Sequence, residues 1–243
     1  MNTHIVNCST VFAGLDTAAA AAAAARAGYR RVEYWWPFPS PVPADDDVDA
    51  FLAGLREAGV HLAAMNLFGG DLGAGERGVL HIRQLPSAHL DIVAHIAAET
   101  GMTMSNLLPG AGGPEILDIQ RERIAEIADY LRPHGVTTLL EPMSGNAHLP
   151  VRDPWVGARL AHDTGCGLLL DFFHCAALGI DTAAYLADAA DDPTLLPAHV
   201  QIADFPGRGA PGTGKAPIAQ WIEQLRAAGY HGDIADEWYP TAN

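Results

Sequence analysis

The feature that most constrains the fold is a regular alternation of short apolar segments with longer segments of helical character. Strands are expected at residues 4–9, 30–36, 60–66, 102–110, 136–142, 166–174, 197–207 and 231–240. Helices are expected at residues 18–25, 45–59, 86–101, 114–135, 154–165, 181–190 and 216–230. This alternation predicts an α/β protein: a (β/α)8 TIM barrel spanning residues 1–243 as a single domain, with a doubly wound open sheet as the alternative.

The expected pattern lacks one element at its C-terminal end. The sequence ends at Asn243, just after the eighth strand, so the eighth helix of the barrel is missing. Either a partner subunit covers the barrel wall at that place, which would make the protein a homo-oligomer, or the chain is naturally short. The 243 residues are 49% hydrophobic, which is enough for one sizeable core.

Charge and cysteine content limit the classes of partner. The net charge is −15 with neutral histidines, and an acidic surface repels both nucleic-acid phosphates and anionic lipids, so neither is expected as a partner. The three cysteines, Cys8, Cys166 and Cys175, show no spacing typical of a disulfide pair, which favours a reduced, cytoplasmic setting. No apolar run has transmembrane length, and no signal peptide is apparent at the start.

A glycine-rich segment near the C-terminus fits the core of a nucleotide-binding P-loop. Gly209 to Lys215 reads G-x-x-x-x-G-K, but Ala216 stands where a P-loop has the Ser or Thr that holds Mg²⁺. Only 28 residues follow Lys215, too few for the further strands of a nucleotide-hydrolysing domain. The segment is therefore not expected to bind ATP.

Oxygen-bearing side chains stand at or near the ends of the last four expected strands. These are Glu141, Asp171, Gln201 and Glu237, one from each strand. The C-terminal ends of barrel strands meet at one rim, where the active sites of such barrels lie. One buried carboxylate could belong to a structural ion pair, but several carboxylates converging with few cations nearby would repel one another without a metal ion.

The donor types favour a hard divalent cation. Three carboxylates and one amide oxygen suit Mg²⁺ or Mn²⁺, and no second cysteine stands at ligand spacing from Cys175 to indicate zinc. Four protein oxygens leave about two positions of an octahedron open. Two adjacent open positions would chelate a substrate with neighbouring oxygens, such as an α-hydroxy-carbonyl compound.

Several segments together resemble the hydroxypyruvate isomerases, within the xylose-isomerase-like sugar isomerases and epimerases. The similar segments are RAGYRRVEYWWPF, NLFGGDLGAGERG, LLEP, DFFH and, most specifically, HVQIADFPGRGAPGTG. The resemblance covers nearly the whole chain, and it identifies the glycine-rich segment as the family's seventh βα loop. It departs from the family at Lys215, where an acidic residue is usual, and at Phe173, where a tyrosine is frequent.

The resemblance implies a role for each candidate site residue. Glu141, Asp171, Gln201 and Glu237 would be metal ligands, and Glu141 and Glu237 would also be the acid/base pair on opposite sides of the substrate. Substrate contacts would come from the following residues: His174, Arg208 and, with weaker support, Glu33, Asn66 and Arg77. Arg208 would grip the carboxylate of an anionic substrate.

The expected activity is a metal-assisted isomerisation of hydroxypyruvate to 2-hydroxy-3-oxopropanoate (tartronate semialdehyde). A carboxylate would move a proton between neighbouring carbons while the cation stabilised the enediolate oxygens. Alternatives on the same barrel are a 2-oxo-tetronate isomerase, a ketose 3-epimerase, a lyase that dehydrates a cyclic polyol, and a non-catalytic barrel that binds a sugar acid or a partner protein. A DNA repair enzyme of this architecture would need a basic face. A hydrolase built on Ser144 and His148 lacks the G-x-S-x-G elbow.

Overall fold

The computed structural model describes residues 5–240, which form a closed barrel of eight parallel strands in the order β1 to β8. Each strand pairs with the next along the chain, and β8 pairs with β1 to close the ring. The strands are β1 (Ile5–Asn7), β2 (Arg31–Tyr34), β3 (His61–Asn66), β4 (Met104–Leu107), β5 (Thr137–Leu140), β6 (Gly167–Asp171), β7 (His199–Ile202) and β8 (Ile234–Asp236). The predicted TIM barrel is confirmed, and the open sheet is excluded.

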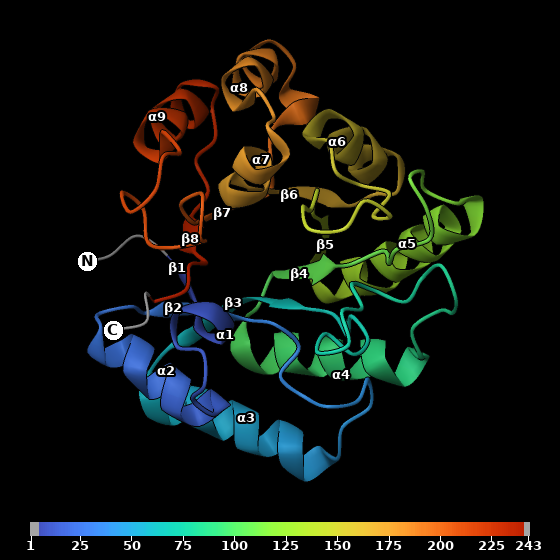
Figure 1. The fold of residues 1–243 in the computed structure, drawn as a ribbon. Helices are drawn as coiled ribbons and strands as arrows, with labels where there is room; N and C mark the ends of the chain where they lie inside the picture. Colours follow the sequence, from blue (N-terminus) through green and yellow to red (C-terminus); the bar gives the residue numbers. More distant parts are fainter. Residues whose placement is uncertain (1–4, 241–243) are drawn as a thin grey trace.

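Helices form an outer ring around the strands (Figure 1). The outer helices are α2 (Thr17–Arg26), α3 (Asp45–Ala58), α4 (Ser87–Thr100), α5 (Asp118–Leu131), α6 (Pro154–Asp163), α8 (Thr182–Asp191) and α9 (Ile218–Ala227). Two short helices, α1 (Cys8–Val11) and α7 (Phe172–Leu178), lie within this ring, directly after strands β1 and β6. The 3-10 turns Arg132–His134 and Pro193–Leu195 complete the helical elements of the described residues.

The strands are apolar because both of their faces are covered. All four residues of β7 are buried, as are the last three residues of β2, β4 and β5. Strands of a parallel sheet with helices outside and packed side chains inside read as continuous hydrophobic runs. The few polar residues in these strands are therefore conspicuous, and Asn7, Asn66 and Asp171 stand at the C-terminal ends of their strands.

Several expected boundaries were wrong, and at two of them a side-chain cap was not recognised. Strand β6 ends at Asp171 rather than at His174, since the Asp171 side chain accepts the N–H of Phe173 and starts α7. Asn7 starts α1 in the same way by accepting the N–H of Ser9. The helix expected from residue 114 begins only at Asp118, after a loop that contains Pro114.

No described helix follows β8, so the ring has no helix between α9 and α2 in Figure 1. Side chains link the strands across this flank instead. The Tyr29 hydroxyl donates to Asp236 at 2.7 Å, and Arg31 pairs with Asp233. The homo-oligomer that the missing helix suggested stays a prediction. Within residues 5–240, none of the helices is both long and apolar enough to cross a membrane.

Candidate active site

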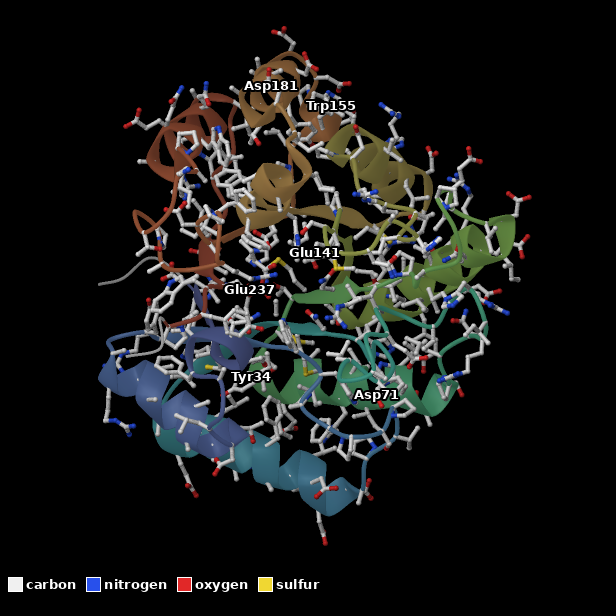
Figure 2. The ribbon with its side chains drawn as sticks, in the orientation of Figure 1. Tyr34, Asp71, Glu141, Trp155, Asp181 and Glu237 are labelled. Carbon is white, nitrogen blue, oxygen red and sulfur yellow. The ribbon has the colours of Figure 1, made fainter. Side chains whose placement is uncertain are left out.

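A cavity of about 540 Å³ opens at the C-terminal ends of the strands. Glu141 follows β5 and Glu237 follows β8, and both side chains line this cavity. Figure 2 shows the two glutamates near the centre of the ring of helices, on strands that are not neighbours. The late strands therefore bring two buried carboxylates to one cavity, as their sequence positions predicted.

Glu141 is held from two sides. The Asn106 side chain, at the end of β4, donates to Glu141 Oε2 at 2.8 Å. His174 Nε2 lies 3.4 Å from Glu141 Oε1. Only 6% of Glu141 is exposed, so these contacts fix its orientation within the cavity.

Glu237 is held by different partners. The Asn7 amide and the Trp35 indole N–H both donate to Glu237 Oε1, at 3.1 and 3.0 Å. The other oxygen, Oε2, pairs with the guanidinium of Arg208. Asn7 and Trp35 come from β1 and from the residue after β2, so the first strands of the chain support the last one.

Gln201 is oriented by a buried carboxylate beneath the cavity. The Gln201 amide nitrogen donates to Glu33 Oε2 at 2.8 Å, and the other oxygen of Glu33 pairs with His199 Nε2. Because the nitrogen is committed to Glu33, the amide oxygen must face the other way. That oxygen is buried and has no hydrogen-bond partner among the described residues. Buried polar atoms almost always have a partner, so this oxygen is available to a metal ion or to a water molecule.

The register places Gln201 directly opposite Asp171 on the neighbouring strand. Asp171 is 1% exposed, and one guanidinium nitrogen of Arg208 lies 3.2 Å from its Oδ2 while also contacting Glu237. The space between the carboxylates of Asp171 and Glu237 therefore already accommodates a positive charge. An unpartnered amide oxygen beside buried carboxylates is the donor set that Mg²⁺ or Mn²⁺ favours, so the residues fit a hard divalent cation.

His174 lies close enough to be considered as a ligand. Its ring nitrogen and the carboxylates of Glu141 and Asp171 lie within 4.8 Å of one another and could hold a metal ion. However, the backbone N–H of Ser144 donates to His174 Nδ1 at 3.1 Å, and although burial lowers the pKa of His174, the charges of Asp171 and Glu141 outweigh it and raise the pKa, so Nε2 carries a proton. In this arrangement Nε2 presents an N–H to the cavity rather than a lone pair, which suits contact with a substrate oxygen.

The carboxyl groups of the site differ in their ionisation. Burial raises the pKa of Glu237 to about 8, although the charge of Arg208 opposes the rise. Burial also acts on Glu141, but the hydrogen bond from His174 and the charge of Arg208 outweigh it and lower the pKa. Burial raises the pKa of Asp171. The pKa values of Glu141 and Glu237 are thus shifted in opposite directions, which is typical of an acid/base pair.

The glycine-rich loop holds Arg208 in place. The backbone N–H groups of Phe205, Gly212 and Ala216 donate to the Asp204 carboxylate at 2.8 to 3.0 Å, so this carboxylate occupies the centre of the loop. A Cβ on Gly214 would lie 2.5 Å from Asp204 Oδ1, which explains the glycine. The loop is thus organised around its own aspartate, which takes up N–H groups that a P-loop would offer to a phosphate.

The model of the xylose isomerase-like TIM barrels matches residues 21–241. The chain belongs to this family. A relative from Streptomyces coelicolor, named provisionally as a hydroxypyruvate isomerase, is 34% identical over 97% of this chain and 90% of its own length. The hydroxypyruvate isomerase of Escherichia coli is 27% identical over 96% of this chain and 92% of its own length. The resemblance predicted from the strand motifs is confirmed.

Other proteins similar to this chain carry different names. The 2-oxo-tetronate isomerase of Haemophilus influenzae is 29% identical over 90% of this chain and 86% of its own length. A solved structure described as an AP endonuclease of family 2 from Brucella melitensis superposes with a TM-score of 0.83 at 24% identity, covering 99% of this chain and 94% of that one. At this identity the likeness shows the shared barrel fold alone.

The remaining predicted contacts divide into two groups. Asn66, Arg77, His174 and Arg208 line the cavity, as does Phe173, whose ring lies 4.8 Å beneath the Arg208 guanidinium. Glu33 does not line the cavity: it is 2% exposed and contacts Gln201 and His199 instead. Lys215 is exposed and lies outside the lining, so its charge is not part of the cavity wall.

Sequence reasoning missed four supporting residues: Asn7, Trp35, Asn106 and Ser144. A signal for the first three was present, since each stands near the end of one of the first four strands, where polar side chains face the same rim as those of the late strands. Ser144 was considered with His148 as a hydrolase pair. The structure instead places its hydroxyl 2.7 Å from His174, and His148 is exposed.

Proposed function

We propose that this protein is a divalent-metal-assisted isomerase that converts hydroxypyruvate to 2-hydroxy-3-oxopropanoate. The observation that carries the proposal is the pairing of two buried glutamates, Glu141 and Glu237, in one cavity, and the unpartnered buried oxygen of Gln201 supports it. The names of the Streptomyces coelicolor and Escherichia coli relatives support the reaction class. Mg²⁺ and Mn²⁺ are the proposed cofactors.

The metal would be held by Glu141, Asp171, Gln201 and Glu237. When bound, it would supply positive charge for the two neighbouring oxygens of the substrate. Gln201 contributes a neutral oxygen whose direction is set by Glu33, and Glu33 is therefore proposed as a positioning residue rather than a substrate contact. Partners of this kind orient metal ligands and are needed for full affinity.

Glu141 and Glu237 are proposed to transfer the proton. One carboxylate removes a proton from C3 of hydroxypyruvate, and a proton returns to C2 from the opposite side, while the hydroxyl proton passes from the C3 oxygen to the C2 oxygen. The fixed contacts to Asn106 on one glutamate and to Asn7 and Trp35 on the other keep both carboxylates in place. Neither side chain needs to reorganise during the transfer.

His174 and Arg208 are proposed to contact the substrate oxygens. The Nε2–H of His174, fixed by Ser144, points into the space shared with Glu141. The Nε of Arg208 also donates to the backbone oxygen of Glu237 at 3.2 Å, which keeps the arginine at the wall of the cavity even if its guanidinium leaves the two carboxylates. Both donors would stabilise negative charge that develops on substrate oxygens.

Solvent proton exchange tests the proposal. The protein is loaded with Mg²⁺ or Mn²⁺ in heavy water, and deuterium incorporation into hydroxypyruvate is followed by proton NMR. We expect exchange, its loss after chelation, and a decrease of at least about 100-fold in E141Q and E237Q, since a positioned acid or base typically contributes that much. E57Q, which removes an exposed carboxylate on α3, is the matched control and should exchange normally.

The outcomes separate the alternatives. Exchange with a four-carbon 2-oxo acid in place of hydroxypyruvate would make the protein a 2-oxo-tetronate isomerase, the name of the Haemophilus influenzae relative. Exchange with a ketose alone would indicate an epimerase. A protein that binds metal yet exchanges no substrate would refute the isomerase and favour a non-catalytic barrel.

A further inference from the structure

The cavity contains two arginines whose surroundings differ sharply. Arg208 contacts Asp171 and Glu237, so its charge is already matched by carboxylates. Arg77 has no carboxylate within 4 Å among the described residues. Its Nη1 donates to two backbone oxygens, those of Leu72 and Glu76, at 3.2 and 2.7 Å. Neutral carbonyls position the guanidinium without neutralising it.

The loop that carries Arg77 is built to hold it at the cavity. Gly69 O accepts the N–H of Gly78 at 2.7 Å, which closes the loop at its base. Gly78 has φ +97, and a Cβ there would lie 1.8 Å from the backbone oxygen of Leu108, so the loop is pressed against the segment after β4. Within the loop, Glu76 Oε2 accepts the N–H of Asp71. The loop therefore fixes the position of Arg77 through its own backbone.

The charges of the site leave a role for this arginine. With a divalent cation bound, all three carboxylates ionised and His174 neutral, the carboxylates, the cation and Arg208 together come to neutrality, so they offer no surplus positive charge to an anionic substrate. The protein as a whole carries a net charge of −15, which also opposes the entry of an anion. A carboxylate in the cavity therefore needs a further cation, and a guanidinium can pair with it through two parallel N–H groups.

We propose that Arg77 is the anchor for the substrate's carboxylate and that it selects 2-oxo acids over neutral ketoses. This inference rests on the proposed isomerase. It changes the assignment made from the sequence, in which Arg208 was expected to grip the carboxylate. The substrate class that follows is a short 2-oxo acid with a neighbouring hydroxyl, held by its carboxylate at Arg77 and by its reacting carbons between Glu141 and Glu237.

Two ligands that differ only in the group expected to contact Arg77 test the proposal. Hydroxypyruvate carries a carboxylate where dihydroxyacetone carries a neutral hydroxymethyl group. Binding of each to the Mn²⁺-loaded protein is measured by calorimetry for the wild type, R77Q and R83Q. Arg83 lies in the same connection between β3 and α4 but is exposed and outside the cavity lining, so R83Q makes the same change in net charge elsewhere.

The R77Q variant should bind hydroxypyruvate roughly 10- to 100-fold more weakly than the wild type, as expected for the loss of a charge-assisted pair. Its affinity for dihydroxyacetone should change less than about twofold, and R83Q should match the wild type for both ligands. Equal losses for both ligands, or no loss for either, would overturn the anchor. If R77Q does not fold, R77K decides: it should weaken hydroxypyruvate binding selectively and by less, and an unselective change overturns the anchor.

The same proteins separate the anchor from the proposed isomerase. Binding that depends on Arg77 without any solvent exchange refutes the isomerase and leaves the anchor standing. If the wild type exchanges protons with solvent but R77Q binds hydroxypyruvate as tightly as the wild type does, the anchor is refuted and the isomerase stands. A wild type that binds neither ligand refutes both.

Discussion

Replacing Glu33 with glutamine tests how the site orients its neutral metal ligand. The substitution keeps the shape of the side chain but replaces an oxygen that accepts from Gln201 or from His199 with an amide nitrogen. The Gln201 amide then loses the contact that sets its direction, and the oxygen that faces the metal can exchange places with the nitrogen. The E33Q variant should therefore bind metal less tightly while its cavity lining stays the same.

The expected size of the effect follows from the burial of these groups. Glu33 and Gln201 are 2% and 3% exposed, so water cannot replace the lost contact. Loss of such a supporting partner typically weakens metal binding about 10- to 100-fold, which corresponds to about 1.4 to 2.7 kcal/mol. A buried donor left without an acceptor also costs about 1–3 kcal/mol of folding stability.

Calorimetric titration with Mn²⁺ measures the affinity, and thermal unfolding measures the stability. The control is D181A, which removes the side chain that accepts the N–H of Ala184 at the start of α8, at the outer edge of the barrel in Figure 2. Loss of this cap should cost about 1 kcal/mol of stability without changing metal affinity. The reasoning is refuted if E33Q binds Mn²⁺ as tightly as the wild type, or if D181A weakens binding equally.

Three further predictions concern charge, pH and backbone geometry. R208A should lower the melting temperature of the metal-free protein by roughly 3–12 °C, because two buried carboxylates lose the guanidinium that pairs with them. Excess Mn²⁺ should restore most of the loss, and equal losses with and without Mn²⁺ would contradict this prediction. Burial lowers the pKa of His89 to about 4, so below pH 6.5 the unfolded chain binds a proton that the folded protein excludes. The free energy of unfolding should therefore fall by up to roughly 3 kcal/mol as the pH drops from 6.5 to 4. In denaturant titrations H89Q should flatten this pH dependence, and an unchanged dependence would exclude His89 as its source. G78A should destabilise the protein by clearly more than about 1 kcal/mol and impair hydroxypyruvate binding, because its Cβ would overlap the Leu108 oxygen. G75A, at a glycine with a similar φ and open space around it, should cost only about 1 kcal/mol. Equal losses of stability in thermal unfolding would contradict the predicted overlap.

The barrel could be predicted from the sequence because each strand is covered on both faces. That burial makes the strands apolar, so a polar residue at a strand end, such as Glu141 or Gln201, stands out. Where the chain turns from strand to helix without a loop, the pattern failed: Phe172 and Phe173 are as apolar as the strand before them, and only the capping contact of Asp171 shows that a helix begins there.

The partners of the site residues were less accessible to prediction. The orientation of the Gln201 amide depends on Glu33, which is 168 positions away in the chain. The placement of Arg208 between two carboxylates depends on a loop folded around Asp204. Such contacts are set by the closure of the barrel and by loop geometry, and a single sequence carries no periodic signal for either.

A crystal structure of the Mn²⁺-loaded protein, with the ion located by its anomalous scattering, tests the central claim most directly. We predict one ion bound by the side-chain oxygens of Glu141, Asp171, Gln201 and Glu237, with Arg208 withdrawn from the space between its carboxylates. An ion held by Glu141, Asp171 and the ring nitrogen of His174, with the Gln201 oxygen left unbound, would contradict the proposed ligand set. Scattering confined to other parts of the protein would contradict the metal site altogether.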